Sequence, residues 1–157
     1  MERALDASKL GDHIDRLYRA AWALCGSRED AEDLVQETFV RVLARPRFLR
    51  KEDDVGYLLR ALRNTFLVRR RAESRRPRTA ALPEDDVVAD ERAGAVEARE
   101  VYAAVAALPA DFRDVLVAVD VAGLSYREAG RALGIPEGTV MSRLYRARRQ
   151  VVARLEG

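Results

Sequence analysis

Apolar residues in the first half of the chain recur at three- and four-residue steps, which is the spacing of an α-helix that buries one side. The pattern predicts helices over 12–25 and about 28–45, and a long third helix from about 54 into an arginine-rich run. Pro46 ends the second helix, and a loop follows it. The predicted buried side chains of the second and third helices are Leu34, Val35, Thr38, Phe39, Val42, Leu43, Leu58, Leu59, Leu62, Phe66 and Leu67.

Two short helices joined by a turn are predicted near the end of the chain. Ser125 and Glu128 have the spacing of a capping box, which starts a helix. Gly134 tolerates the left-handed conformation that ends a helix, and Pro136 suits the turn that follows. The next helix begins near 137–139 and is basic, so the pair indicates a helix-turn-helix.

The last predicted helix has one aliphatic side and one basic side. Its buried stripe consists of Val140, Leu144, Ala147, Val151 and Leu155. Its other side carries the donor-rich side chains of Thr139, Ser142, Arg143, Arg146, Arg149 and Gln150. Guanidinium groups match phosphate oxygens and the major-groove acceptors of guanine, so this side indicates DNA binding, with a merely solvated basic face as the alternative. Gly130, in the preceding helix, leaves room for the last helix to pack closely.

Residues 77–98 separate the two helical segments and show no sustained helical period. Prolines, small residues and an acidic run give them the composition of a linker. No strand-like alternation is present. The sequence therefore predicts an all-α fold in which two small helical domains, 1–76 and 99–157, are joined by a flexible acidic linker, and in which the second is a helix-turn-helix domain.

Composition excludes several classes of function. The chain has 157 residues and a net charge of +2, with no signal-peptide core and no run of about 18 apolar residues, so we expect a cytoplasmic protein. Cys25 and His13 are single, which excludes a zinc cluster, a disulfide or a Cys/His catalytic pair within one chain. No nucleophile with a base and no glycine-rich phosphate loop is present, so we expect no enzyme, no metal and no cofactor. Cys25 is expected to be a buried core thiol.

Charged residues gather in two places in the first domain. The outward side of the second helix carries Glu32, Asp33, Gln36, Glu37 and Arg41. The third helix and its end carry Arg60, Arg63, Arg69, Arg70, Arg71, Arg75, Arg76 and Arg78. An arginine cluster of this density indicates phosphate binding, whereas an acidic helix face is commonly just solvated surface.

Three stretches together resemble the extracytoplasmic-function (ECF) sigma factors of bacterial RNA polymerase. They are DAEDLVQETFVRVL, VGYLLRALRNTFLVRRR and the segment from LPADFRDVL to the end of the last helix. The resemblance covers nearly the whole chain, in the right order and at the right separation. It implies a dissociable subunit that binds core polymerase and promoter DNA, with sigma region 2 in the first domain and region 4 in the second.

The resemblance also implies roles for individual residues. Asp33, Gln36 and Glu37 would bind the clamp helices of the largest polymerase subunit, and the second domain would bind the flap of the second-largest subunit. The loop 46–54 and the following helix would capture an unstacked base of the minus-ten element. The residues implied at this element are Phe48, Tyr57, Arg60, Arg63, Asn64, Thr65, Arg70 and Arg71. An asparagine offers a donor and an acceptor to a base edge, and Phe48 or Tyr57 could stack on it.

The last helix would read the minus-thirty-five element through Thr139, Ser142, Arg143, Arg146 and Arg149. Two positions depart from the family: many members have tryptophan where this chain has Tyr57, and lysine or arginine is usual where it has Met141. Tyr57 is then either a stacking or a packing residue. The linker either mimics nucleic acid or is a soluble tether.

The resemblance also implies control by a separate anti-sigma factor that masks the polymerase-binding surfaces. Two alternatives stay open at this stage. One is a stand-alone helix-turn-helix regulator, and the other is a sigma-like protein that only sequesters a partner.

Overall fold

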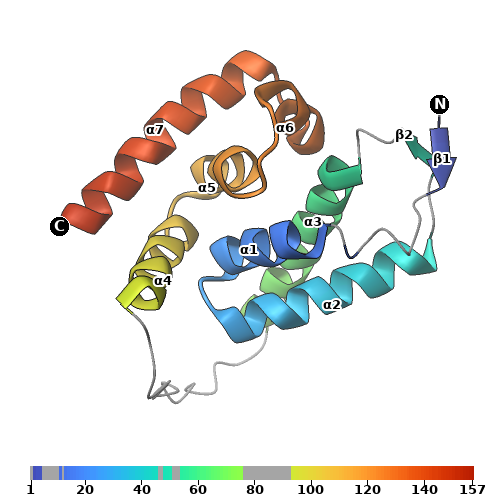
Figure 1. The fold of residues 1–157 in the computed structure, drawn as a ribbon, viewed down its shortest axis with the longest axis horizontal. Helices are drawn as coiled ribbons and strands as arrows, with labels where there is room; N and C mark the ends of the chain where they lie inside the picture. Colours follow the sequence, from blue (N-terminus) through green and yellow to red (C-terminus); the bar gives the residue numbers. More distant parts are fainter. Residues whose placement is uncertain (1, 5–10, 12, 46–47, 51–53, 76–92) are drawn as a thin grey trace.

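The computed structural model describes residues 2–4, 11, 13–45, 48–50, 54–75 and 93–157 (Figure 1). This part of the chain is almost entirely helical, which confirms the predicted all-α class. No helix in the described ranges is both long and apolar enough to span a membrane. The helices are α1 (Ile14–Cys25), α2 (Arg28–Ala44), α3 (Asp54–Arg75), α4 (Ala93–Ala106), α5 (Ala110–Leu116), the π-helical turn η3 (Val117–Val121), α6 (Tyr126–Leu133) and α7 (Glu137–Glu156).

A short antiparallel ribbon joins the start of the chain to the segment after α2. Strand β1 (Glu2–Ala4) pairs with β2 (Phe48–Arg50), and Arg3 lies opposite Leu49. The sequence does not predict these strands, because three residues are too few to show an alternation of apolar and polar positions. β2 lies within the predicted loop 46–54, whose remaining residues before α3 lie outside the described ranges.

The first domain is a bundle of α1, α2 and α3. The hydroxyl of Ser27 accepts a hydrogen bond from the backbone N–H of Asp30 at 3.4 Å and so caps the start of α2. Most of the predicted stripe is buried, at Leu34, Val35, Thr38, Val42, Leu58, Leu59, Leu62 and Phe66, whereas Phe39 and Leu67 are half-buried. Leu43 is 48% exposed, and its predicted burial is wrong because it lies at the edge of the apolar stripe, beside Val42, which takes the core side of the same turn and is 4% exposed.

The helix-turn-helix of α6 and α7 has the predicted turn chemistry. Ser125 and Glu128 form both bonds of the capping box, at 3.1 and 2.9 Å. Gly134 has a φ of +71°, a conformation that glycine adopts without strain. A Cβ placed on Gly130 would lie 2.8 Å from the carbonyl oxygen of Ile135, so the predicted close approach at this glycine is confirmed.

The aliphatic stripe of α7 packs against α5, α6 and α4. Four of its five predicted members are buried, namely Val140, Leu144, Ala147 and Val151. Leu155 is 45% exposed. Its predicted burial is wrong because all residues from 152 onward are exposed, so no neighbour covers the last turn of this helix.

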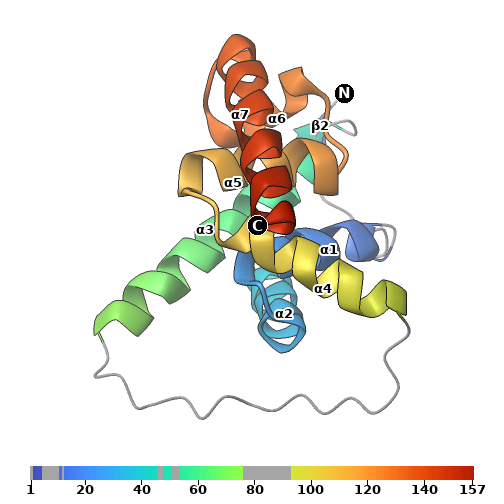
Figure 2. The same ribbon diagram turned by 90° about the vertical axis from the view of Figure 1, so that its left-hand side faces the viewer.

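The two domains pack against each other in this structure. Helix α1 lies against α4 and η3, and α3 lies against α6 (Figure 2). The ring of Trp22 in α1 lies 4.3 Å, centroid to centroid, from that of Tyr102 in α4. This aromatic contact places part of the hydrophobic core between the domains.

Helix α4 begins earlier than the sequence predicts. It starts at Ala93, so residues 93–98, which the sequence assigns to the linker, are helical. Their alanine and glycine residues show no apolar stripe, and for this reason periodicity does not detect the helix. Residues 76–92 lie outside the described ranges, and the boundaries 1–76, 77–98 and 99–157 remain a prediction.

Candidate nucleic-acid interface

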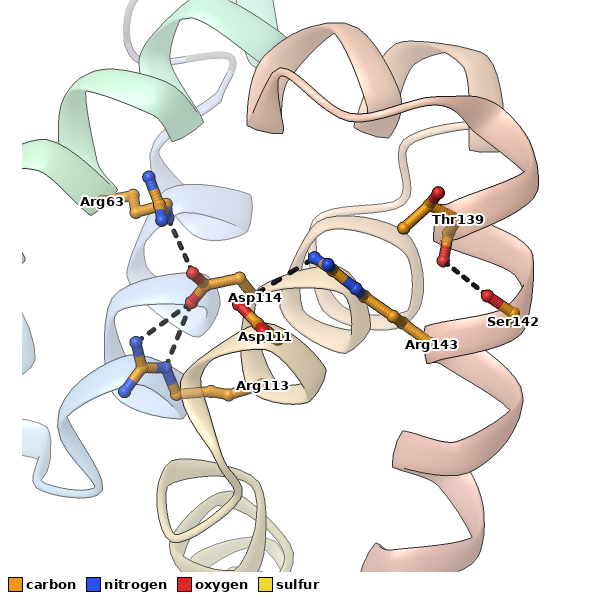
Figure 3. A network of polar contacts seen from close by, with 7 residues as sticks. All are labelled: Arg63, Asp111, Arg113, Asp114, Thr139, Ser142 and Arg143. Atoms are coloured by element: carbon orange, nitrogen blue, oxygen red, sulfur yellow. Dashed lines mark hydrogen bonds and ion pairs between the residues drawn. The ribbon is translucent and has the colours of Figure 1, made fainter.

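The polar side of α7 presents the predicted minus-thirty-five residues. Ser142, Arg146 and Arg149 are exposed, and Thr139 and Arg143 are half-buried. The hydroxyl of Ser142 donates to the carbonyl oxygen of Thr139 at 3.2 Å (Figure 3). This face is therefore open to a ligand along most of its length.

Two arginines of this face are oriented by neighbouring side chains. The Nη1 of Arg143 lies 3.9 Å from Oδ1 of Asp111 in α5 (Figure 3). The guanidinium of Arg149 lies 5.7 Å from the ring centroid of Tyr145, one helical turn away. Both contacts are exposed, and a phosphate can replace Asp111 as the partner of Arg143 at small cost.

Sequence reasoning does not find the residue pair that fixes α7 on η3. Arg148 donates to both carboxylate oxygens of Asp120, at 2.9 and 2.7 Å. The hydrogen bond to Asp120 raises the pKa of Arg148 above its already high value. The pair joins two elements that the sequence gives no reason to place together, so only the tertiary structure shows it.

A cavity of about 350 Å³ lies between α2 and α3. It brings together four of the predicted minus-ten residues, Tyr57, Arg60, Asn64 and Thr65. The lining is completed by residues that the sequence does not assign to this site, namely Arg41, Val42, Arg45 and Ala61. Arg41 lies in the last turn of α2 and Arg45 is the C-cap residue that follows it, so helical periodicity does not relate the two arginines.

Thr65 is a buried member of the cavity lining. Its hydroxyl donates a hydrogen bond to the carbonyl oxygen of Ala61 at 2.8 Å, so the hydroxyl proton is engaged within α3 and is not directed at a base in the cavity. Asn64, beside it, is exposed and presents its amide at the surface. Phe48 lies in β2, and its side chain is outside the described part of the structure, so its stacking role remains a prediction.

Arg63 does not line the cavity and instead meets the second domain. Its Nε donates to Oδ2 of Asp114 at 2.7 Å (Figure 3). Arg113 donates to the other oxygen of Asp114 through Nε and Nη2, both at 3.1 Å, and its guanidinium lies 4.9 Å from the ring centroid of Phe66. Asp114 and Arg113 are buried, so this is a charged cluster within the domain interface. The DNA role of Arg63 remains a prediction.

The predicted polymerase-binding residues lie on α2. Asp33 and Gln36 are exposed, whereas the side chain of Glu37 is 33% exposed. One oxygen of Glu37 accepts from Arg41 at 3.1 Å, and the other accepts from Arg69 of α3 at 2.5 Å. Glu37 therefore links the acidic face of α2 both to Arg41, which lines the cavity, and to Arg69 of α3. Of the two arginines that follow Arg69, Arg70 lies 5.4 Å from the ring centroid of Phe66, and Arg71 is exposed.

Cys25 is half-buried at the end of α1, where it packs against the core. Burial raises the pKa of its thiol to about 12, and the nearby carboxylate of Asp30 adds to the effect. The thiol is thus protonated at neutral pH and unreactive. Its surroundings agree with the core role that the sequence predicts.

An arginine-rich helix in one domain and a basic helix-turn-helix in the other define a DNA-binding protein of two modules. Residues 10–76 match the model of Sigma-70 region 2, and residues 98–151 match that of Sigma-70, region 4. The chain is 42% identical over 153 residues to the ECF RNA polymerase sigma factor SigE of Mycolicibacterium smegmatis. This match covers 88% of the chain and 57% of the relative. It is 38% identical over 130 residues to the probable RNA polymerase sigma-C factor of Mycobacterium bovis, with 80% and 70% covered.

The fold is similar to that of a solved sigma factor. The sigma factor RpoE of Bartonella quintana, crystallised in complex with the anti-sigma factor NepR, superposes with a TM-score of 0.72 at 25% identity, over 95% of each chain. The chain therefore belongs to the ECF RNA polymerase sigma factors. The chain spans little more than half the length of the SigE relative.

Proposed function

We propose that this protein binds core RNA polymerase through the acidic face of α2 and directs it to promoters through two DNA-binding surfaces. The cavity between α2 and α3 takes a base of the melted minus-ten element, and the polar face of α7 reads the minus-thirty-five element. The catalytic chemistry belongs to the polymerase. The protein works in the cytoplasm, where its polymerase and promoters are.

The observation that carries this proposal is the cavity itself. Tyr57, Asn64 and Thr65 line one concave site together with three arginines, Arg41, Arg45 and Arg60. A flipped base needs a site of this kind, with an apolar or aromatic wall, an amide for its edge and cations for the adjoining phosphates.

The polymerase contact is supported by charge. Asp33 and Gln36 are exposed on the same side of α2 as Glu37, and two carboxylates in such an arrangement suit a basic partner surface. Opposite charge across an interface speeds association and fixes register.

An anti-sigma factor is the expected regulator. The support comes from the fold: the similar sigma factor of Bartonella quintana was crystallised with its anti-sigma factor NepR. A pull-down from native lysate under uninduced conditions tests this expectation. Recovery of a small partner in place of polymerase subunits is expected, and recovery of polymerase subunits only contradicts it.

The proposed function is tested by in vitro transcription from a pooled genomic template with purified core polymerase. Discrete start sites that appear only when the protein is added are expected, and their shared upstream sequences identify both promoter elements. Core binding without start sites indicates a sequestering protein, and DNA binding without core binding indicates a stand-alone regulator.

A further inference from the structure

We propose that Arg41 and Arg45, at the carboxyl end of the helix predicted to bind polymerase, hold the phosphate backbone of the strand whose base enters the cavity between α2 and α3. This inference rests on the proposed function and adds two DNA-binding residues to it. It also places a polymerase contact, Glu37, and a promoter contact, Arg41, in successive turns of the same side of α2.

The first step is the position of the two arginines around the cavity. Arg41 and Val42 line it from the last turn of α2 and Arg45 from the C-cap that follows, and Tyr57 and Asn64 line it from α3. Val42 is buried, whereas Arg41 and Arg45 are exposed. The cavity thus has a closed floor of packed side chains and an open rim where the two guanidinium groups stand.

The second step is the charge of the lining. Three of its eight residues are arginines, Arg41, Arg45 and Arg60, and none is acidic. By contrast, the cavity between α1, α4, η3 and α7 is mostly aliphatic, and its two arginines share the lining with Asp120. A concave site with three cations and no lining carboxylate is suited to an anion, and guanidinium forks match phosphate oxygens.

The third step is the match between the parts of the cavity and the parts of a nucleotide. The apolar and neutral groups of Val42, Ala61, Tyr57 and Asn64 form a surface against which a base can lie. A base inserted there leaves its sugar and phosphates at the opening, where the exposed arginines are. The volume of about 350 Å³ is within the range of about 300–1,000 Å³ that small-molecule sites occupy.

The fourth step is the orientation of Arg41. Its Nη2 donates to Oε1 of Glu37 at 3.1 Å, one helical turn earlier on α2. This bond holds the Arg41 side chain along the helix and leaves its other donors available. Glu37 is therefore a positioning residue for the cavity as well as a predicted polymerase contact.

The test uses holoenzyme reconstituted from core polymerase and the full-length chain. The probe is a fluorescent single strand carrying a minus-ten element found by the transcription experiment, and its affinity is measured as a function of salt. R41Q and R45Q are compared with R16Q, which removes the same charge from an exposed residue of α1 that does not line the cavity. A second probe has uncharged methylphosphonate linkages beside the inserted base.

We expect R41Q and R45Q each to weaken strand binding by roughly tenfold, because one charge-assisted hydrogen bond is lost. The slope of log K against log salt falls by about 0.7 for each phosphate contact removed from a single strand. R16Q leaves both quantities unchanged. The methylphosphonate probe weakens binding of wild type but adds little to the loss in the two variants.

Wild-type holoenzyme that does not bind the natural strand contradicts the proposed function itself. Wild-type binding with R41Q and R45Q indistinguishable from R16Q overturns this inference alone. The inference is also overturned when the variants weaken binding but lose just as much affinity as wild type on the methylphosphonate probe. R41K and R45K keep the positive charge and should retain part of the affinity for the strand. If the arginines only stabilised the fold, the loss of affinity would not depend on whether the substituted side chain is charged.

Discussion

The Nε of Arg63 in α3 lies 2.7 Å from Oδ2 of Asp114 in α5, and this ion pair joins the two domains through a largely buried carboxylate. The second oxygen of Asp114 accepts from Arg113. Asp114 therefore neutralises one arginine from each domain. Removal of such a carboxylate leaves two cations facing each other at the interface.

We expect D114N to lower the free energy of unfolding by about 3 kcal/mol, near the low end for breaking a buried ion pair because Arg63 is one-third exposed. D111N is the matched control, since Asp111 is 75% exposed and 3.9 Å from Arg143, and should change stability by less than about 0.5 kcal/mol. Urea unfolding measures both. Equal effects of the two substitutions would show that the interdomain pair is not stabilising.

The closely packed turn of the helix-turn-helix gives a second prediction. G130A should destabilise the protein by about 1–3 kcal/mol, because its Cβ would lie 2.8 Å from the carbonyl oxygen of Ile135 and the backbone must move. G138A, in the first turn of α7, meets no atom within 4 Å and should instead stabilise by up to about 1 kcal/mol. Thermal unfolding distinguishes them, and a stabilising G130A would contradict the close approach.

The capping box of α6 predicts a dependence on pH. The hydrogen bonds from Ser125 lower the pKa of Glu128, so ionised Glu128 stabilises the folded state above its unfolded pKa, and this contribution is lost as pH falls through the lower folded pKa. E128Q should therefore be less stable than wild type at pH 7, and the difference should shrink below about pH 4. Urea titrations at both pH values test this, and a pH-independent difference would refute it.

S125A tests the other half of the same box. The hydroxyl of Ser125 accepts the N–H of Glu128 at 3.1 Å, and its loss should cost about 1 kcal/mol of stability. S125T, which keeps a capping oxygen, should restore most of that loss. Stability of S125A equal to that of wild type would mean that solvent replaces the cap without cost.

Substitutions of Glu37 and Asp33 should have different effects on polymerase binding and on DNA-strand binding. Both are predicted to contact polymerase, but only Glu37 also pairs with Arg41 and Arg69. D33N should slow association with core polymerase in a salt-dependent way and leave strand binding by the assembled holoenzyme unchanged. E37Q should weaken both. Stopped-flow association and strand-binding titrations measure the two quantities, and an E37Q variant that matches D33N in both would argue against the link.

The sequence predicts the helices well because their signals are local. The stripe of α7 and the cap of α6 each depend on residues within a few positions of one another, and the structure confirms them. The errors at Leu43 and Leu155 have different causes, because Leu43 lies at the edge of its stripe beside the buried Val42, whereas Leu155 lies beyond the last covered turn of α7. Periodicity identifies the apolar side of a helix but not how far the neighbouring helices extend along it.

The parts of the site that the sequence misses depend on contacts between distant segments. Arg63 and Asp114 are 51 positions apart, and no periodic pattern relates them. Arg41 is recognised as an outward residue of α2, but its place at the rim of a cavity depends on where α3 packs. The π-helical turn η3 has no signal in its valine-rich sequence either, although its Asp120 holds Arg148 of the DNA-reading helix.

The most direct test of the polymerase-dependent mechanism is in vitro transcription that compares the wild type with the Asp33→Arg/Glu37→Arg double variant on the pooled genomic template. Reversal of both charges should abolish the start sites while the isolated double variant still binds minus-thirty-five duplex through α7. Start sites that persist at wild-type strength in the double variant would contradict docking through the acidic face of α2.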